Sequence, residues 1–405
     1  MTSATDPRAV GRAQVFKGEV LAGYLARGSG SDEVLFDYAP AYLASGGPPV
    51  ARTLPLSARA QRSRGGAVPP FFAGLLPEGR RLQALIRTVK TSADDELSLL
   101  LAVGGDCIGD VRILVEGAPP ASLQVTLSDP AQVCFHEVFE RAIDPAGVLR
   151  SEALPGVQDK ISASTLSLPV RFAGSEALLK LSPQTLPLLV ENEAHMLSLA
   201  AACGLAVPRR QVLTDRDGHT GLLVGRFDRI AAPAGLMRLA QEDAVQLAGR
   251  WPAGKYRMST REVFAATLAV TPAKAATALH LLRLFAFSYA IGNGDLHAKN
   301  VSAYAPDGHL WQLTPAYDLV TTLPYGDQRM ALALEGRDDN LNGATFTTLG
   351  EAFGVPARAT HRMLAELSDR LSPHVDGVAA IGFDDRRTSH LVTVMRRRLG
   401  DLTRW

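Results

Sequence analysis

Three oxygen-bearing side chains in the second half of the chain have types and a spacing that could support chemistry. Asn300 follows Asp295 by five residues, and a second carboxylate, Asp318, follows Asp295 by 23 residues. Mg²⁺ takes oxygen ligands and uses one or two carboxylates together with the phosphates of a substrate. In phosphoryl transfer a further Asp accepts the proton of the attacking hydroxyl. The spacing therefore predicts Asp295 as a base and Asn300 and Asp318 as ligands of Mg²⁺.

A plainer interpretation stands beside this one, because residues 293–295 are typical of a turn and Asp and Asn often cap helices. The surroundings weigh against it. Residues 281–291 form an apolar helical run that should be buried, and residues 301–313 predict a hairpin that turns at residues 307–308. Several polar residues would then crowd the ends of one short hairpin, which is costly unless they bind something. They are Asp295, His297, Lys299, Asn300 and Asp318.

A lysine inside an apolar strand is the next candidate. Lys180 lies in the run 177–181, and a buried Lys is rare unless it is paired. Glu193 follows 13 residues later in a predicted helix over 189–203, on the face that carries Met196, Leu197 and Ala200. A strand Lys that meets an inward helix Glu is the ion pair that positions the α/β-phosphates in kinases. A simple structural salt bridge is the alternative.

Two glycine-containing loops precede predicted strands. Residues 103–111 carry three glycines but no Lys-Ser/Thr after them, so we expect a structural turn rather than a P-loop. Residues 154–160 place Gly156 and Lys160 just before a strand over 161–168, where backbone N–H groups could bind an anion. Since one glycine is a weak signal, a plain hairpin turn is the favoured interpretation of residues 154–160 when they are taken alone.

Composition indicates a soluble, cytoplasmic protein. The chain has 405 residues, with 42 Lys and Arg against 41 Asp and Glu, so no overall charge draws it to nucleic acid or membrane. Its three cysteines lack metal-ligand spacing, which suits a reducing compartment. No run approaches the ~20 apolar residues of a membrane span, and residues 1–10 do not form a signal peptide.

The order of predicted elements favours an α+β fold with two lobes, as in protein kinases. Strands dominate residues 12–60 and 161–229, whereas residues 241–405 are mostly helical. We expect an N-terminal subdomain over 1–145, a sheet-containing lobe over 146–230 and a helical lobe over 231–405, with a linker near 118–122. Residues 225–229 leave the second sheet where a kinase hinge would present its backbone to adenine.

The chain resembles the HipA family of serine/threonine kinase toxins of bacterial toxin–antitoxin pairs. The resemblance spans nearly the whole length. Its most specific motifs are Gly-Asp-Leu-His-Ala-Lys-Asn at 294–300, Pro-Gly-Val-Gln-Asp-Lys at 155–160 and Thr-Pro-Ala-Tyr-Asp at 314–318. The other motifs that carry it occupy residues 75–79, 105–111, 179–181, 191–193, 226–229 and 241–243.

This resemblance implies ATP and Mg²⁺ as cofactors and a role for each matched residue. Asp295 would be the catalytic base, and Asn300 and Asp318 would hold Mg²⁺. Lys180, paired with Glu193, would contact the ATP phosphates. The remaining cofactor-binding residues would be the loop that covers the phosphates, the adenine-lining segment, and residues beside the phosphates: Pro155, Gly156, Val157, Gln158, Asp159, Lys160; Gly225, Arg226, Phe227; His297, Lys299 and Tyr317. We assign no role to residues 241–243 beyond a structural one.

The resemblance also implies partners. Members of the family phosphorylate an aminoacyl-tRNA synthetase and are held in check by a helix-turn-helix antitoxin, and the complex binds operator DNA. The sequence departs from the family at Ala153, where members have a serine whose phosphorylation inactivates them. Ser151 lies two residues earlier, so self-inactivation by the usual route is in doubt.

Two other functions remain to be distinguished. A catalytically weak or silent relative would serve as a corepressor with a DNA-binding antitoxin, although the intact set of polar residues argues against silence. A small-molecule kinase of the aminoglycoside or choline type would share the lobes and the acids. Direct DNA binding by this chain alone is not expected, since only residues 396–398 form a short basic run.

Overall fold

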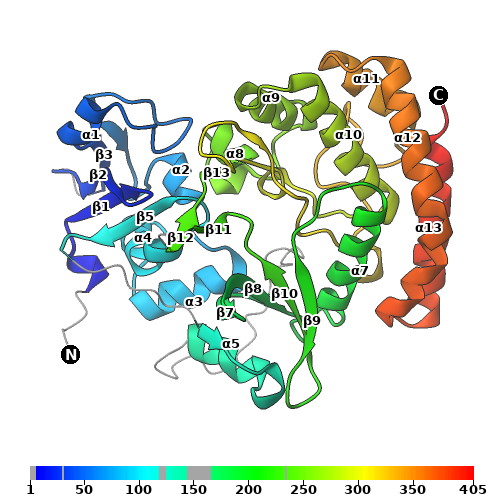
Figure 1. The fold of residues 1–405 in the computed structure, drawn as a ribbon, viewed down its shortest axis with the longest axis horizontal. Helices are drawn as coiled ribbons and strands as arrows, with labels where there is room; N and C mark the ends of the chain where they lie inside the picture. Colours follow the sequence, from blue (N-terminus) through cyan, green and yellow to red (C-terminus); the bar gives the residue numbers. More distant parts are fainter. Residues whose placement is uncertain (1–5, 30–31, 118–124, 144–165, 233–234) are drawn as a thin grey trace.

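The computed structural model describes residues 6–29, 32–117, 125–143, 166–232 and 235–405. They form a blue and cyan sheet unit at the left of Figure 1, a green sheet at the lower centre and a helical unit at the right. The α+β class and the change from a β-rich N-terminal part to a helical C-terminal part are confirmed. Among the described residues, no helix has the length and apolar composition needed to cross a membrane.

The N-terminal unit is built on an antiparallel sheet of order β4-β3-β2-β1-β5. Alternate residues of β3 are buried, as expected for a strand with one face on a core. Phe72 of α2 and Leu97 of α4 pack into that core. The elements are β1 (Arg12–Lys17), β2 (Val20–Arg27), β3 (Val34–Tyr38), α1 (Pro40–Ser45), β4 (Gln61–Ser63), α2 (Pro70–Ala73), α3 (Gly79–Val89), α4 (Glu96–Val103) and β5 (Val111–Val115).

The second sheet has the order β6-β7-β8-β10-β9, in which β6 is parallel to β7 and the other pairs are antiparallel. Helix α5 packs Phe135 against one face, and α7 packs Val190 against Leu222 and Val224 on the other. Lys180 pairs in register with Leu222, so its side chain faces α7. The elements are β6 (Val125–Leu127), α5 (Phe135–Ile143), β7 (Leu166–Phe172), β8 (Ser175–Leu181), α7 (Leu189–Ala202), β9 (Arg210–Thr214) and β10 (Thr220–Gly225).

The helical unit surrounds α10, whose residues from Leu284 to Ile291 are all buried. This helix packs against α12 and α13 and delivers the chain to the residues that follow Gly292. Its elements are β11 (Arg229–Ala232), β12 (Gly235–Arg238), β13 (Gln241–Asp243), α8 (Ala244–Leu247), α9 (Thr260–Val270), α10 (Lys274–Ile291), β14 (Ser302–Tyr304), β15 (Gln312–Leu313), α11 (Gly343–Ala352), α12 (Ala357–Leu371) and α13 (Asp385–Leu402).

Most predicted elements are confirmed, including the hairpin β14–β15 and the helix that carries Glu193. Some helix starts were wrong. Hydrophobic periodicity predicts a helix over 265–270, but helix α9 begins at Thr260, because Ser259 and Glu262 form a reciprocal capping box at its start. Periodicity likewise predicts a helix over 347–353, but α11 begins at Gly343, where the Asn342 side chain caps it. The glycines and prolines of residues 65–79 predict a connector, but this segment contains α2, which begins with a proline at its first turn.

Candidate active site

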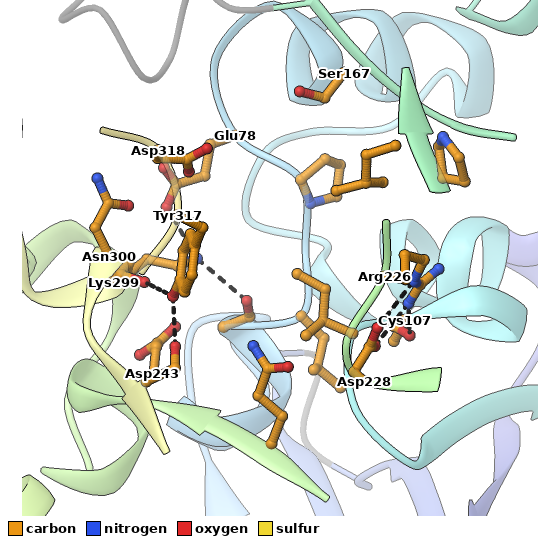
Figure 2. Close-up of a pocket in the computed structure, with 18 of the residues that line it drawn as sticks. Glu78, Cys107, Ser167, Arg226, Asp228, Asp243, Lys299, Asn300, Tyr317 and Asp318 are labelled. Atoms are coloured by element: carbon orange, nitrogen blue, oxygen red, sulfur yellow. Dashed lines mark hydrogen bonds and ion pairs between the residues drawn. The ribbon is translucent and has the colours of Figure 1, made fainter. Parts of the chain in front are cut away.

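A cavity of about 320 Å³ lies where the three units meet (Figure 2). The N-terminal unit contributes residues 74–78, the second sheet contributes β7, β8 and β10, and the helical unit contributes residues 297–302 and 317–318. Figure 2 shows Lys299, Asn300 and Tyr317 on one side of the cavity and Arg226 and Asp228 on the other. The cavity therefore brings together residues that are far apart in the sequence.

Lys180 is held between two carboxylates at this cavity. Its ammonium nitrogen lies 2.6 Å from Glu193 Oε1 and also forms an ion pair with Asp318. The Lys180 side chain is only 6% exposed and that of Glu193 only 4%, so the pair is buried as the sequence predicted. Burial opposes the charge on Lys180, but Asp318 and Glu193 outweigh it and raise the pKa of Lys180 above its ordinary value. Lys180 is therefore a permanent cation.

Asp318 has an unusual backbone conformation. Its φ is +52°, in the left-handed region that a non-glycine residue rarely adopts. Its backbone N–H donates to Glu193, which helps to hold this conformation. The Asp318 side chain is 37% exposed and lines the cavity. Backbone strain of this kind is often kept at functional sites, and here it turns a carboxylate toward the cavity.

The turn after α10 positions Asp295. Gly292 ends the helix with a φ of +72°, and the Asn293 side chain then accepts the backbone N–H of Asp295 at 2.9 Å. A Cβ on Gly294 would lie 2.6 Å from the carbonyl oxygen of Arg329, so only glycine fits there. The residues that resembled an ordinary turn do form one, and its geometry fixes the Asp295 backbone.

Tyr256 and Asn300 both form hydrogen bonds with Asp295. The hydroxyl of Tyr256 donates to Asp295 Oδ1 at 3.0 Å, and the amide Nδ2 of Asn300 donates to the Asp295 carbonyl oxygen at 3.0 Å. This second bond orients the Asn300 side chain so that Oδ1 is the atom left for a cation. Asn300 and Asp318 both line the cavity and offer the hard oxygen donors that Mg²⁺ prefers. The residues present therefore fit the metal that the sequence predicted.

His297 and Lys299 lie close to these residues. Burial, reinforced by the positive charge of Lys255, lowers the pKa of His297 to about 3, so the imidazole is neutral at pH 7. The Lys299 ammonium lies 3.0 Å from a carboxylate oxygen of Glu78 and donates to the Gly74 carbonyl oxygen at 3.2 Å. Both residues line the cavity, as a position beside phosphates requires.

Tyr317 and Phe227 form part of an aromatic cluster at the cavity. The Tyr317 hydroxyl donates to the Lys299 carbonyl oxygen at 2.8 Å and lies 2.5 Å from Ser302 Oγ. The ring of Phe227 lies 5.8 Å from that of Tyr317 and 6.0 Å from that of Tyr304, measured between centroids. These rings give one end of the cavity flat apolar surfaces, which suit a planar base.

Gly225 and Arg226 also line the cavity, but the Arg226 guanidinium is engaged elsewhere. It lies 3.1 Å from Asp106 and 2.9 Å from Asp228, and it donates to the Cys107 carbonyl oxygen at 3.0 Å. The side chain is only 4% exposed. The contribution of Arg226 to a ligand would therefore come from its backbone.

The predicted phosphate loop, with Pro155, Gly156, Val157, Gln158, Asp159 and Lys160, lies outside the described residues, and so do Ser151 and Ala153. The roles given to them stay predictions. The structure also brings in residues that the sequence reasoning did not assign. Glu78, Lys255 and Tyr256 contact the predicted site, and Asp243 lines the cavity, where burial raises its pKa to about 6.

Comparison with known proteins assigns both halves of the chain. Residues 153–375 match the family described as HipA-like C-terminal domain, and residues 13–114 match the HipA N-terminal domain. A Sinorhizobium fredii protein named "Putative kinase Y4dM" is 32% identical over 327 residues, which cover 75% of this chain and 72% of that protein. The serine/threonine-protein kinase toxin HipA of Shewanella oneidensis is 25% identical over 388 residues, covering 87% of this chain and 86% of that protein.

A solved structure supports the same relationship at the level of the fold. In the complex of Shewanella oneidensis HipA, HipB and their operator DNA, one chain superposes with a TM-score of 0.79. The alignment covers 96% of this chain and 97% of that one, at 22% identity. The match of more than half of the sequence to the C-terminal domain, together with the N-terminal match, shows that this chain belongs to the HipA family.

Proposed function

We propose that this chain is an ATP- and Mg²⁺-dependent serine/threonine protein kinase and the toxin of a toxin–antitoxin pair. The observation that supports this most directly is the convergence of Lys180, Asn300 and Asp318 on one cavity. Glu193 is paired with Lys180, and Asp295 is bonded to Asn300. The names of the relatives, a kinase toxin and a kinase, agree with it. The division of the chain near residues 145 and 230 is part of the proposal, since the two larger sheets pack into separate hydrophobic clusters.

Each residue then has a defined task. Lys180 binds phosphate oxygens of ATP through its permanent positive charge. Asp295 accepts the proton of the serine or threonine hydroxyl while the oxygen bonds to the γ-phosphorus and the bond to the β-phosphate oxygen breaks, which releases ADP. Tyr256 donates its hydroxyl to Asp295 Oδ1 and so helps to fix the orientation of the carboxylate. Mg²⁺, held by Asn300 and Asp318, would neutralise charge on the phosphates.

The partners follow from the family and are part of the same proposal. An aminoacyl-tRNA synthetase in the cytoplasm is the proposed substrate, and a HipB-like helix-turn-helix protein is the proposed antitoxin. The Shewanella oneidensis assembly contains HipA, HipB and operator DNA together. We therefore propose that this chain reaches DNA only through its antitoxin, and that the isolated chain binds operator DNA weakly.

The test is transfer of labelled phosphate from ATP to a mixture of synthetases by the wild type and Asp295→Asn. The substitution keeps the shape of the side chain but removes its ability to accept a proton, so incorporation should fall by about 10²–10⁴-fold. Asp369→Asn, on the exposed surface of α12, is the matched control and should behave as the wild type. Equal incorporation by Asp295→Asn and the wild type would contradict the assignment of the base.

The same assay separates the alternatives. Transfer to a small hydroxyl compound and none to protein would instead favour a small-molecule kinase. No transfer by the wild type, with operator binding in the presence of the antitoxin, would favour a silent corepressor. Growth arrest on expression, followed by phosphoproteomics of the arrested cells, would identify the substrate.

A further inference from the structure

Two lysines flank Asp295, and both contact the same carboxylate. Lys299 follows Asp295 in the chain and lies 3.0 Å from Glu78 Oε1. Lys255 precedes Tyr256, the residue that donates to Asp295, and its ammonium forms an ion pair with Glu78 Oε2. The Lys255 carbonyl oxygen also accepts the backbone N–H of Ala298 at 3.2 Å, which fixes the Lys255 segment against the catalytic loop. Glu78 therefore bridges two cations beside the proposed base.

The bridge is largely removed from water. The exposed fraction of the side chain is 10% for Lys255, 14% for Lys299 and 29% for Glu78. Among the described residues, Glu78 is the one carboxylate that forms an ion pair with Lys255. Two largely buried ammonium groups that share one carboxylate need an anion between them, because an uncompensated buried charge is costly.

The position of the bridge indicates which other anion could fill it. Glu78 belongs to the N-terminal unit, yet it lines the same cavity as Asn300 and Asp318. Figure 2 draws Glu78, Lys299, Asn300 and Asp318 together on one side of that cavity. Lys180, the other lysine of the cavity, already faces two carboxylates. The four negative charges of a triphosphate exceed the positive charge of Lys180 and one Mg²⁺ together, so a further cation near its outer end would stabilise it.

We propose that Glu78 competes with the terminal phosphate of the nucleotide for two lysines: Lys299, which lines the cavity, and Lys255, which shares the Glu78 carboxylate with it. The inference rests on the proposed function, since it takes a nucleoside triphosphate as the ligand of the cavity. A carboxylate and a phosphoryl group both present anionic oxygens that accept charge-assisted hydrogen bonds from ammonium groups. Binding of the triphosphate displaces Glu78 from the two lysines, and release of the phosphate lets Glu78 return.

This inference predicts that Glu78 competes with phosphate but not with the nucleoside. A permanent structural clamp between the N-terminal and helical units would predict the opposite, because breaking it would disorder the lysines and weaken binding of the triphosphate. The two possibilities therefore differ in the sign of the effect on triphosphate affinity. Adenosine, which has no phosphate, serves as the internal reference.

The experiment is calorimetric titration of the full chain with adenosine and with a non-hydrolysable ATP analogue in the presence of Mg²⁺. Glu78→Gln removes the competing charge, and the dissociation constant of the analogue should fall about tenfold while that of adenosine changes less than twofold. Lys255→Met removes one cation and should weaken the analogue about tenfold, again without an effect on adenosine. The dissociation constants of each variant for the analogue and for adenosine are compared with those of the wild type.

Asp110→Asn is the matched control, because it breaks another buried pair, in which Asp110 Oδ1 lies 2.8 Å from the Lys17 ammonium. It should leave both dissociation constants unchanged. Thermal unfolding checks that each variant is folded, and Glu78→Ala, which also removes the carboxylate, replaces Glu78→Gln if that variant does not fold. Unchanged or weaker binding of the analogue to the Glu78 variant would overturn this inference alone. A wild type that binds neither ligand would overturn it together with the proposed function.

Discussion

Two buried clusters of charge line the same cavity, but they are built differently. The hinge cluster consists of Asp106, Arg226, Asp228 and Arg229, where the chain leaves the second sheet. Each of its guanidinium groups contacts both carboxylates and the Cys107 carbonyl oxygen. The cleft cluster consists of Lys180, Glu193 and Asp318. Its outermost carboxylate keeps an exposed fraction of 37% and a strained backbone.

The difference shows how burial of charge can serve two purposes. In the hinge cluster protein groups satisfy the charges, so removal of one member leaves buried charges unpaired and destabilises the fold. In the cleft cluster Asp318 has oxygen atoms that face the cavity, and its backbone conformation is maintained at a cost. We infer that the hinge cluster joins the N-terminal unit to the kinase sheet, whereas the cleft cluster is prepared for a ligand.

Asp318→Asn tests the ligand-binding half of this comparison and has the largest expected effect. The substitution keeps the size of the side chain but removes the negative charge that a metal requires. We expect phosphate transfer to fall about a thousandfold, which corresponds to about 4 kcal/mol of lost transition-state stabilisation. The free energy of unfolding should fall by less than in Asp106→Asn, because Lys180 keeps Glu193 as a buried partner in this variant.

The measurement is the rate of labelled phosphate transfer together with urea unfolding of the same sample. Asp369→Asn, on the exposed surface of α12, is again the control. A stable Asp318→Asn variant with wild-type activity would show that Asp318 is not a metal ligand. A large loss of stability would show that the cleft cluster resembles the hinge cluster after all.

Asp106→Asn tests the structural half. Asp106 accepts from Arg226 at 3.1 Å, from Arg229 at 3.1 Å and from Arg238 at 3.2 Å. Without its charge three guanidinium groups share fewer anions, so the free energy of unfolding should fall by about 3 kcal/mol. Urea unfolding measures this, with Asp94→Asn at an exposed position as the control. A loss below about 1 kcal/mol would contradict a structural role for the hinge cluster.

The sequence predicted the parts of the site that local patterns determine. The spacing of Asp295, Asn300 and Asp318 lies within one stretch of chain, and Lys180 and Glu193 are linked by a strand and a helix whose inward faces are readable from periodicity. The same applies to most helices and strands. Boundaries failed where a capping box, rather than hydrophobic periodicity, started the helix, as at Ser259.

The rest depends on contacts between distant segments. Glu78 meets Lys255 and Lys299 across 177 and 221 positions of the sequence, and nothing in the local pattern at residue 78 indicates such partners. The motif at 75–79 contributes to the resemblance to the family but carries no signal for a role of Glu78. Arg226 was assigned to the nucleotide because of its place near the hinge, whereas its side chain is bound to Asp106 of another unit. Tertiary packing determines both outcomes.

The ion pairs of Glu78 with Lys255 and Lys299 join the N-terminal unit to the cleft. Their contribution to stability should depend on pH, and this is the smallest effect that we predict. Burial alone would raise the pKa of Glu78, but Lys299 and Lys255 outweigh it and lower the pKa from 4.5 to about 2. Between these values the unfolded chain binds more protons than the folded protein, so the contribution of Glu78 to stability is complete above about pH 5 and is lost as the pH falls toward 2.

The free energy of unfolding of the wild type should therefore fall by about 1 kcal/mol more than that of Glu78→Gln between pH 6 and pH 3.5, since each pKa unit is worth about 1.4 kcal/mol. Urea unfolding at both pH values measures the difference, and Glu351→Gln at an exposed site is the control. Parallel losses in the wild type and Glu78→Gln would show that Glu78 is not held between the lysines in solution. A wild-type excess that disappears when a triphosphate is bound would show that nucleotide binding breaks this pair while the hinge cluster stays intact.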